Sequence, residues 1–261
     1  MARFSLKGWR RLMPKFTYLL LLLIVSTLGL SLLKRTYSLS AADAAQKAST
    51  PDRSQEAKQH FPLAEYDEPD LADPAKNTAK KEKQKRHNNF KFVAKNPQPW
   101  QTESVFIPEG NLDFPALPVR TSQLIVVGRV RDASAHLSEH KMNVYSEFGI
   151  AVTSVLKRAT EAITDGSLIT VERLGGNVRY PSGQKVLFRI SGWNMPKVGS
   201  EYLFFLNSRN KADWEILTAY ELAESGVLPL DESSQFQVLK GTSSLDLLRQ
   251  VRALISAQPS K

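Results

Sequence analysis

An uncharged run from residue 16 to residue 33, FTYLLLLLIVSTLGLSLL, most constrains what this chain can fold into. It is bounded by Lys15 on one side and by Lys34 and Arg35 on the other. As a helix rising 1.5 Å per residue it would span roughly 27 Å, close to the ~30 Å hydrocarbon core of a bilayer. We therefore predict a transmembrane signal-anchor over residues 16–35 that contacts the lipid bilayer through residues 16–33.

The charges around this run predict its orientation. Basic residues near a membrane span favour the cytoplasmic side. Five basic and no acidic side chains precede the run, whereas three basic ones, Lys34, Arg35 and Lys47, follow it closely. We expect residues 1–15 to form a cytoplasmic tail of a single-pass protein of the cell membrane, with the remainder exported, periplasmic or extracellular.

A cleaved secretory signal is the competing interpretation. Ala42-Asp43-Ala44 resembles the small-residue site at which such signals are cut. The apolar run is longer than a usual signal core, and Lys34-Arg35 separates it from that site. The anchor is therefore favoured, and in both cases the C-terminal part is exported.

The net charge of +9 is unevenly distributed. Residues 1–35 contribute +7 and residues 36–99 contribute +2, while residues 100–261 hold seventeen basic and seventeen acidic side chains. Nucleic-acid-binding domains usually carry a basic surface of their own, so we expect no nucleic-acid partner. The absence of cysteine excludes disulfides, a cysteine nucleophile and thiolate metal sites.

Residues 36–99 lack apolar periodicity and carry their charges in blocks, acidic over residues 65–73 and basic over residues 76–86. Segments that cannot bury enough apolar surface stay disordered. We therefore predict a disordered, charged linker over residues 36–99. Contact between its basic block and anionic headgroups or wall polymers is the alternative.

Residues 100–261 predict one mainly β domain. Strand patterns occur in LIVVGRVRDA, MNVYSEFGIAVTSVL, SLITVERL, KVLFRI, EYLFFLN and WEILTAY. In the second of these segments, alternate residues from Val144 to Val152 share one face and those from Tyr145 to Thr153 the other. The last segment has helical periodicity, with Thr242 to Ser244 offering N-cap hydroxyls. Its expected buried face comprises Leu245, Leu248, Val251, Leu254 and Ile255.

The succession SQLIVVGRV, VYSEFGIAVTSVLKR, SLITVERLGG and MPKVGSEYLFFL, over roughly residues 122–206, resembles a group of bacterial exported domains of unassigned function. Those domains in turn resemble the OB-like barrel of netrin and tissue-inhibitor-of-metalloproteinase modules. The resemblance implies a small OB-like Greek-key β-barrel followed by an amphipathic helix. Metalloproteinase inhibition in that family works through an N-terminal cysteine, which this chain lacks.

Arg173, Arg179, Tyr180 and Trp193 form the candidate binding set, on or near the turns around the third and fourth strands. OB-like barrels bind oligomers across such a face through stacking aromatics and cationic side chains. The alternative is that the aromatic rings cap a barrel end and that the arginines are solvated.

Two further patterns suggest chemistry. His136-Leu137-Ser138-Glu139-His140 matches the H-x-x-E-H pattern of inverted zinc peptidases, which requires both histidines on one helix. The pattern lies between two predicted strands, where a hydrophilic loop is expected instead. Glu172 and Glu221 could act together in acid–base chemistry if folding brought them into contact.

We therefore expect a non-catalytic binding or scaffolding module of the bacterial cell envelope, without a cofactor, whose partner is an envelope protein or a wall polymer. A zinc-dependent hydrolase using His136 and His140 is one alternative. A tethered transducer of the TonB-like kind is the other, although the Pro-rich repeats of such proteins are missing.

Overall fold

The structure is a computed structural model that describes residues 61–89, 103–106, 114–158, 162–210 and 213–258. The predicted anchor at residues 16–35 lies outside these residues, as does the cytoplasmic tail. Among the helices that are described, none is both long and apolar enough to cross a bilayer.

The described part of the chain is mainly β, as predicted. Its strands are β1 (Leu63–Glu65), β2 (Glu103–Phe106), β3 (Leu124–Leu137), β4 (Val144–Lys157), β5 (Leu168–Leu174), β6 (Gly176–Arg179), β7 (Lys185–Ile190), β8 (Glu201–Asn210), β9 (Asp213–Ala223) and β10 (Gly226–Pro229). Its helices are α3 (Pro74–Arg86), the 3₁₀ turn η1 (His87–Asn89), α4 (Ser234–Gln237) and α5 (Ser244–Ser256). All six strands expected from the sequence are present.

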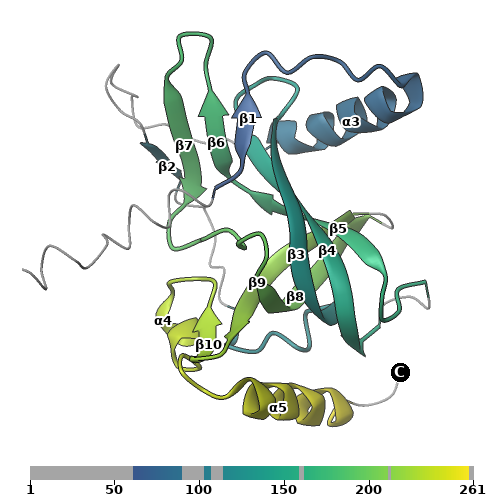
Figure 1. Ribbon diagram of the computed structural model, residues 1–261, viewed down its shortest axis with the longest axis vertical. Helices are drawn as coiled ribbons and strands as arrows, with labels where there is room; N and C mark the ends of the chain where they lie inside the picture. The colour runs from purple at the N-terminus through teal and green to yellow at the C-terminus, as the bar shows by residue number, and fades with distance from the viewer. Residues whose placement is uncertain (1–60, 90–102, 107–113, 159–161, 211–212, 259–261) are drawn as a thin grey trace, which may run out of the picture. The chain divides into compact units, whose positions relative to one another are not determined.

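The larger sheet closes on itself. Its strand order is β10-β9-β5-β4-β3-β8, and β9 also pairs with β8, so that β3, β4, β5, β9 and β8 form a closed circuit. The β5–β9 pairing is parallel and the other pairings of the circuit are antiparallel. Figure 1 shows β3 and β4 running side by side as long strands of this circuit.

Gly128 is required where β3 passes between β8 and β4. The pairing of β3 with β4 shifts register between Val127 and Gly128. A Cβ at residue 128 would lie 2.6 Å from Ile150 Cγ2 and 2.9 Å from the Ala151 carbonyl oxygen, closer than van der Waals contact allows. The absence of a side chain therefore lets the two strands approach at this register shift.

A second, four-stranded sheet has the order β1-β6-β7-β2. Strands β6 and β7 form an antiparallel hairpin, and β1 and β2 add to its two edges in parallel. The sheet lies beside the ends of β3 and β4 (Figure 1).

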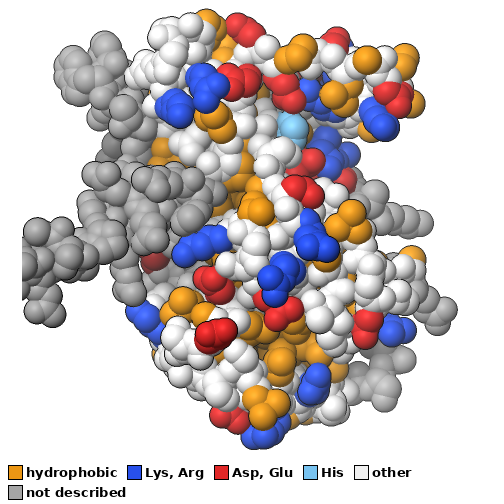
Figure 2. Space-filling view, viewed as in Figure 1, with side chains coloured by type: hydrophobic (Ala, Val, Ile, Leu, Met, Phe, Trp, Pro, Cys, Tyr) orange, Lys and Arg blue, Asp and Glu red, His pale blue; other side chains and the backbone are white. Residues whose placement is uncertain are grey.

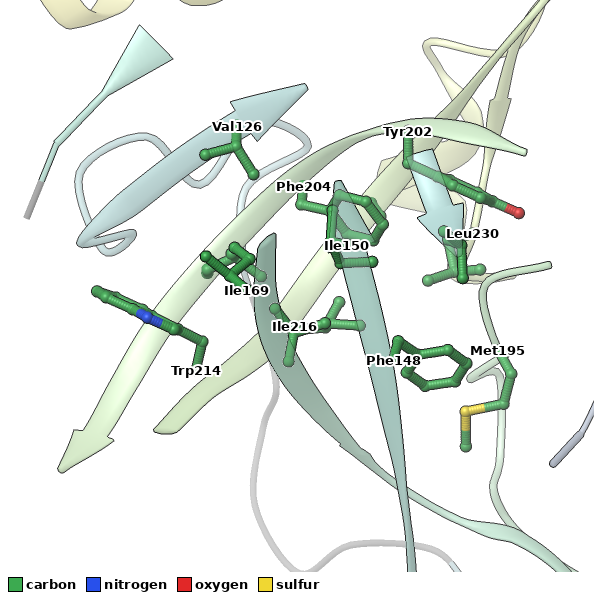
Figure 3. Close-up of a cluster of buried hydrophobic side chains, with 14 of the residues drawn as sticks. Val126, Phe148, Ile150, Ile169, Met195, Tyr202, Phe204, Trp214, Ile216 and Leu230 are labelled. Atoms are coloured by element: carbon green, nitrogen blue, oxygen red, sulfur yellow. The ribbon is translucent and has the colours of Figure 1, made fainter. Parts of the chain in front are cut away.

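The main core fills the interior of the closed circuit (Figure 3). Side chains from β3, β4, β5, β8 and β9 meet there; among them are Val126, Phe148, Ile169, Phe204 and Ile216. The predicted grouping of alternate residues on one face of β4 is consistent with the structure, because those from Val144 to Val152 are all buried.

The C-terminal helix is confirmed as α5, with Ser243 as its N-cap. The buried side chains are Leu247 and Val251, with Leu248 and Ile255 packed beside them. The expected face is thus partly wrong, since Leu245 is 64% exposed and Leu254 is 45% exposed. The buried face of the helix is therefore rotated relative to the predicted one and includes Leu247, which contacts the sheet.

The expectation of a disordered linker over residues 36–99 is wrong for residues 61–89. These residues form β1, α3 and η1 and belong to the same compact unit as the rest of the described chain. They are held by pairing of β1 with β6 and by ion pairs rather than by an apolar stripe, which is why periodicity did not reveal them. The folded domain therefore begins before residue 100.

Candidate functional site

A cluster of carboxylates on the outer face of the closed circuit forms the candidate site. Glu147 of β4, Glu172 of β5 and Asp213 of β9 surround the ammonium group of Lys83 in α3, with Nζ–O distances of 2.6, 2.8 and 3.5 Å. Arg86 also pairs with Asp213. We call these three carboxylates, with the strands that carry them, the acidic face. Figure 2 shows acidic and basic side chains interleaved on the surface near α3.

Local sequence explains why a helix forms at residues 74–86. The Asp73 carboxylate accepts hydrogen bonds from the backbone N–H groups of Ala75 and Lys76, and Pro74 occupies the first turn, where a missing N–H does no harm. Basic residues populate the last turn and suit the negative end of the helix dipole. No residue within the helix is buried, so α3 has no apolar face with which to pack.

Three side chains of α3 and η1 that pair with neighbouring segments follow helical spacing. Residues 80, 83 and 87 are three and four positions apart and so share one side of a helix. Lys80 pairs with Glu68 at 2.8 Å, Lys83 with the acidic face, and His87 with Glu172 at 3.1 Å. We call these three residues the cationic stripe.

His87 closes the C-terminal end of this contact. Its ring is buried and stacks on Tyr145 of β4, with centroids 3.9 Å apart and planes inclined by 13°. Asn143 Nδ2 donates to the His87 carbonyl oxygen at 2.7 Å. The face of β4 that carries Tyr145 is therefore covered at this residue.

The turn between β3 and β4 adds further contacts with η1. Asn88 Nδ2 donates to Glu139 at 3.0 Å, and the His140 backbone N–H donates to Asn88 Oδ1 at 3.1 Å. The C-terminal end of α3 is thus fixed in orientation, while its N-terminal end is held by charge pairs.

The ion pairs shift the pKa values of the groups that make them. Burial alone would raise the pKa of Glu172, but the hydrogen bond with His87 and the Lys83 ammonium lower it to about 2. Burial opposes the charge on Lys83, yet Glu147 and Glu172 raise its pKa above the ordinary value. Both groups are therefore charged at neutral pH.

The zinc-peptidase interpretation of residues 136–140 lacks the geometry that it needs. His136 lies near the end of β3 and His140 lies in the following turn, so the two do not share a helix. His136 Nδ1 is 3.4 Å from Glu68, and its Nε2 is 3.7 Å from Glu147. Among the described residues, no group of three or more His, Asp or Glu side chains is arranged to hold a metal ion.

Arg173 was expected at a binding surface, and this expectation is wrong. Its side chain is fully buried and pairs with Asp231, which also accepts a hydrogen bond from Thr218 at 2.8 Å. The guanidinium group lies over the Trp193 ring, 4.5 Å from its centroid. Burial lowers the pKa of Arg173 and raises that of Asp231, against the attraction between them. Arg173 therefore belongs to a buried ion pair, and its guanidinium group packs on the half-buried Trp193 ring.

Arg179 and Tyr180 lie at the surface, where β6 meets β1. Arg179 pairs with Glu65 at 2.7 Å, and Tyr180 stacks on Tyr66 with centroids 5.0 Å apart. The Lys141 ammonium also lies over the Tyr66 ring, 4.2 Å from the ring centroid. These residues border a groove of about 240 Å³. Their rings and charges already form the contacts that attach β1 to the domain.

The carboxylate pair suggested by Glu172 and Glu221 is not formed. Glu172 is paired with α3, whereas Glu221 accepts a hydrogen bond from Ser200 at 2.7 Å. The residues that sequence reasoning missed are Lys83, His87 and Glu147, because their importance depends on contacts between α3 and distant strands.

Comparisons of this chain with protein-family models, with curated proteins and with solved structures found no match.

Proposed function

We propose that this chain is a membrane-anchored, non-catalytic binding module of the bacterial cell envelope. In this proposal residues 16–35 anchor it, residues 1–15 lie in the cytoplasm, and the domain is exported. The uncharged run and the basic residues before it support this topology.

The strand circuit supports an OB-like barrel. Taken in chain order, β3, β4, β5, β8 and β9 are strands one to five, connected in space as one-two-three-five-four-one. Strands three and five are parallel. OB folds bind their ligands on the face of strands two and three and on the loops that follow strands one and four. In this chain those elements are β4, β5, the turn that carries Glu139, and the connection before Asp213.

The observation that carries the proposal is the seating of Lys83 among three carboxylates from three different strands. Glu172, which takes part in this contact, has a side chain only 8% exposed. Carboxylates gathered around an ammonium group in a partly desolvated setting recognise cations through charge-assisted hydrogen bonds. An acidic face favours a basic protein partner over nucleic acid or an anionic wall polymer.

The proposal is tested with the full chain, solubilised from membranes after crosslinking. We expect a specific envelope protein to copurify with the wild type and to be lost from the Glu147→Gln/Glu172→Gln variant. The control is Glu224→Gln/Glu232→Gln, which removes the same charge at two exposed positions. Equal capture by all three chains, or no specific partner for the wild type, would contradict the proposal.

The topology is tested separately by fusing a reporter after residue 99. Activity of an exported reporter at that position supports the proposal, whereas activity of a cytoplasmic reporter contradicts it.

A further inference from the structure

We propose that α3 is a ligand surrogate bound in cis, and that the acidic face recognises a lysine-rich helix of a partner protein when α3 is displaced. This inference rests on the proposed function and identifies the class of ligand. It goes further in assigning residues 74–87 an autoinhibitory role.

The docking mode of α3 is that of a helical ligand. One side of the helix meets the acidic face: Lys83 and Arg86 pair with its carboxylates, and His87 contacts Glu172. Lys80, on the same side, pairs with Glu68 of the preceding segment. Helix-binding proteins usually read side chains at such spacings, ordinarily apolar ones in an apolar groove. In this protein Lys83 and Arg86 are cationic and the receptor is anionic, so the preferred ligand is a helix with lysines or arginines at positions i and i+3.

The ionic character of the contact makes α3 replaceable. No side chain between Pro74 and Arg86 is buried, so the core surface that release uncovers is confined to the Tyr145 ring on which His87 stacks. The barrel retains its core without α3, since that core consists largely of side chains from the closed circuit. On the N-terminal side, Phe61 and Ala64 are buried and β1 pairs with β6. The exposed residues before α3 can therefore act as a hinge while β1 stays attached.

The segment that carries α3 holds acidic as well as basic side chains, and both kinds form ion pairs. The acidic block before the helix also pairs with the domain: Glu65 with Arg179, Asp67 with Lys141, and Glu68 with His136. These pairs hold the hinge near the acidic face. A segment tethered so closely has an effective concentration in the millimolar range.

A partner helix must compete with α3 at this effective concentration. A free helix with the same intrinsic affinity, present at about 1 μM, would occupy roughly one site in a thousand while α3 competes in cis. Substitutions that weaken the docking of α3 at the cationic stripe should therefore increase binding of a separate helix. Substitutions elsewhere in α3 should increase it much less.

The test uses a fluorescein-labelled peptide with the sequence of residues 70–89 and fluorescence anisotropy with the full chain in detergent. The variant Lys80→Glu/Lys83→Glu removes two members of the cationic stripe. Its matched control, Lys76→Glu/Lys81→Glu, makes the same charge change on the same helix at side chains that are 77% and 52% exposed. We expect the first variant to bind the peptide at least about tenfold more tightly than the wild type or the control.

Two further arms establish that the peptide occupies the acidic face. Adding Glu172→Gln to the stripe variant should abolish the gain, and a peptide with glutamine at the positions of Lys80 and Lys83 should not bind. A folded stripe variant, as judged by circular dichroism, that binds no more tightly than the control overturns the inference. So does equal binding of the glutamine peptide.

If the stripe variant does not fold, the wild type supplies the test. Millimolar peptide should displace α3 and accelerate tryptic cleavage within residues 76–86, and the glutamine peptide should not. Unchanged cleavage overturns the inference. These peptide experiments are independent of partner capture from the envelope, so a failure of the inference is distinguishable from a failure of the proposed function.

Discussion

The ammonium group of Lys83 lies 2.6 Å from a carboxylate oxygen of Glu147, and this ion pair joins α3 to the second strand of the closed circuit. Lys83 is 19% exposed and serves two further carboxylates, Glu172 and Asp213. Lys83 therefore reduces the mutual repulsion among three anions from three strands, with Arg86 as a second cation beside Asp213.

Replacing Lys83 with methionine should destabilise the domain by about 3 kcal/mol, because breaking a largely buried ion pair leaves uncompensated charges behind. The free energy of unfolding is measured by denaturant titration with tryptophan fluorescence. The control is Lys81→Met, because Lys81 pairs with Asp70 where both side chains are exposed. Such pairs contribute about 1 kcal/mol or less. Equal losses from the two variants would show that the acidic face does not depend on Lys83.

The attachment of α3 should also depend on salt. Since α3 buries no side chain, its contact relies on charge, and at about 1 M salt the screening length falls to roughly 3 Å. We expect hydrogen exchange of α3 amides to accelerate when salt is raised from about 0.05 M to about 1 M. The internal control is α5, which is held by the buried side chains Leu247 and Val251. Parallel acceleration of both helices would indicate general loosening instead.

The strands of the circuit were predictable because burial of one face imposes alternation. The β4 pattern of Val144, Phe148 and Ile150 is an example, and all three side chains are buried in the core. The strand order was not predictable in the same way, because the parallel β5–β9 pairing joins strands that are separated by three others in the chain.

The attachment of residues 61–89 could not be read from apolar periodicity. Lys80, Lys83 and His87 have helical spacing, but a polar stripe is ordinarily solvated, and its partners come from strands far along the chain. Tyr145, an aromatic residue on the outer face of β4, was the one signal that something covers that face.

Only part of the candidate binding set is accessible, and binding by it stays a prediction. Arg179 and Tyr180 lie partly exposed at the surface, whereas the burial of Arg173 depends on where the chain after β10 places Asp231. No local pattern around residue 173 contains that information.

Arg173 provides a test of the distinction between a binding residue and a structural one. Arg173→Ala should destabilise the domain by about 3–5 kcal/mol, since it leaves Asp231 buried without its counter-charge. The double variant Arg173→Met/Asp231→Leu should recover much of this loss in denaturant titrations, because apolar replacements remove both charges together. A double variant as unstable as Arg173→Ala would mean that the pair itself stabilises the fold.

Glu172 should make stability depend on pH in the acid range. Its pKa falls from an ordinary 4.5 to about 2 in the folded protein. A carboxyl group with a lowered folded-state pKa stabilises the protein above its unfolded value, and that contribution disappears as the pH falls through the folded value. The shift corresponds to about 3 kcal/mol. We therefore expect the wild type to lose stability between about pH 5 and about pH 2 more steeply than Glu172→Gln does.

The measurement is the free energy of unfolding of the full chain in detergent, at several pH values in that interval. The difference between the wild type and Glu172→Gln should be largest at the upper end and shrink toward the lower end. Glu224→Gln, at an exposed position, serves as the control and should differ from the wild type by a small, nearly constant amount. A wild-type curve parallel to that of Glu172→Gln would mean that His87 and Lys83 do not hold this carboxylate in its charged form.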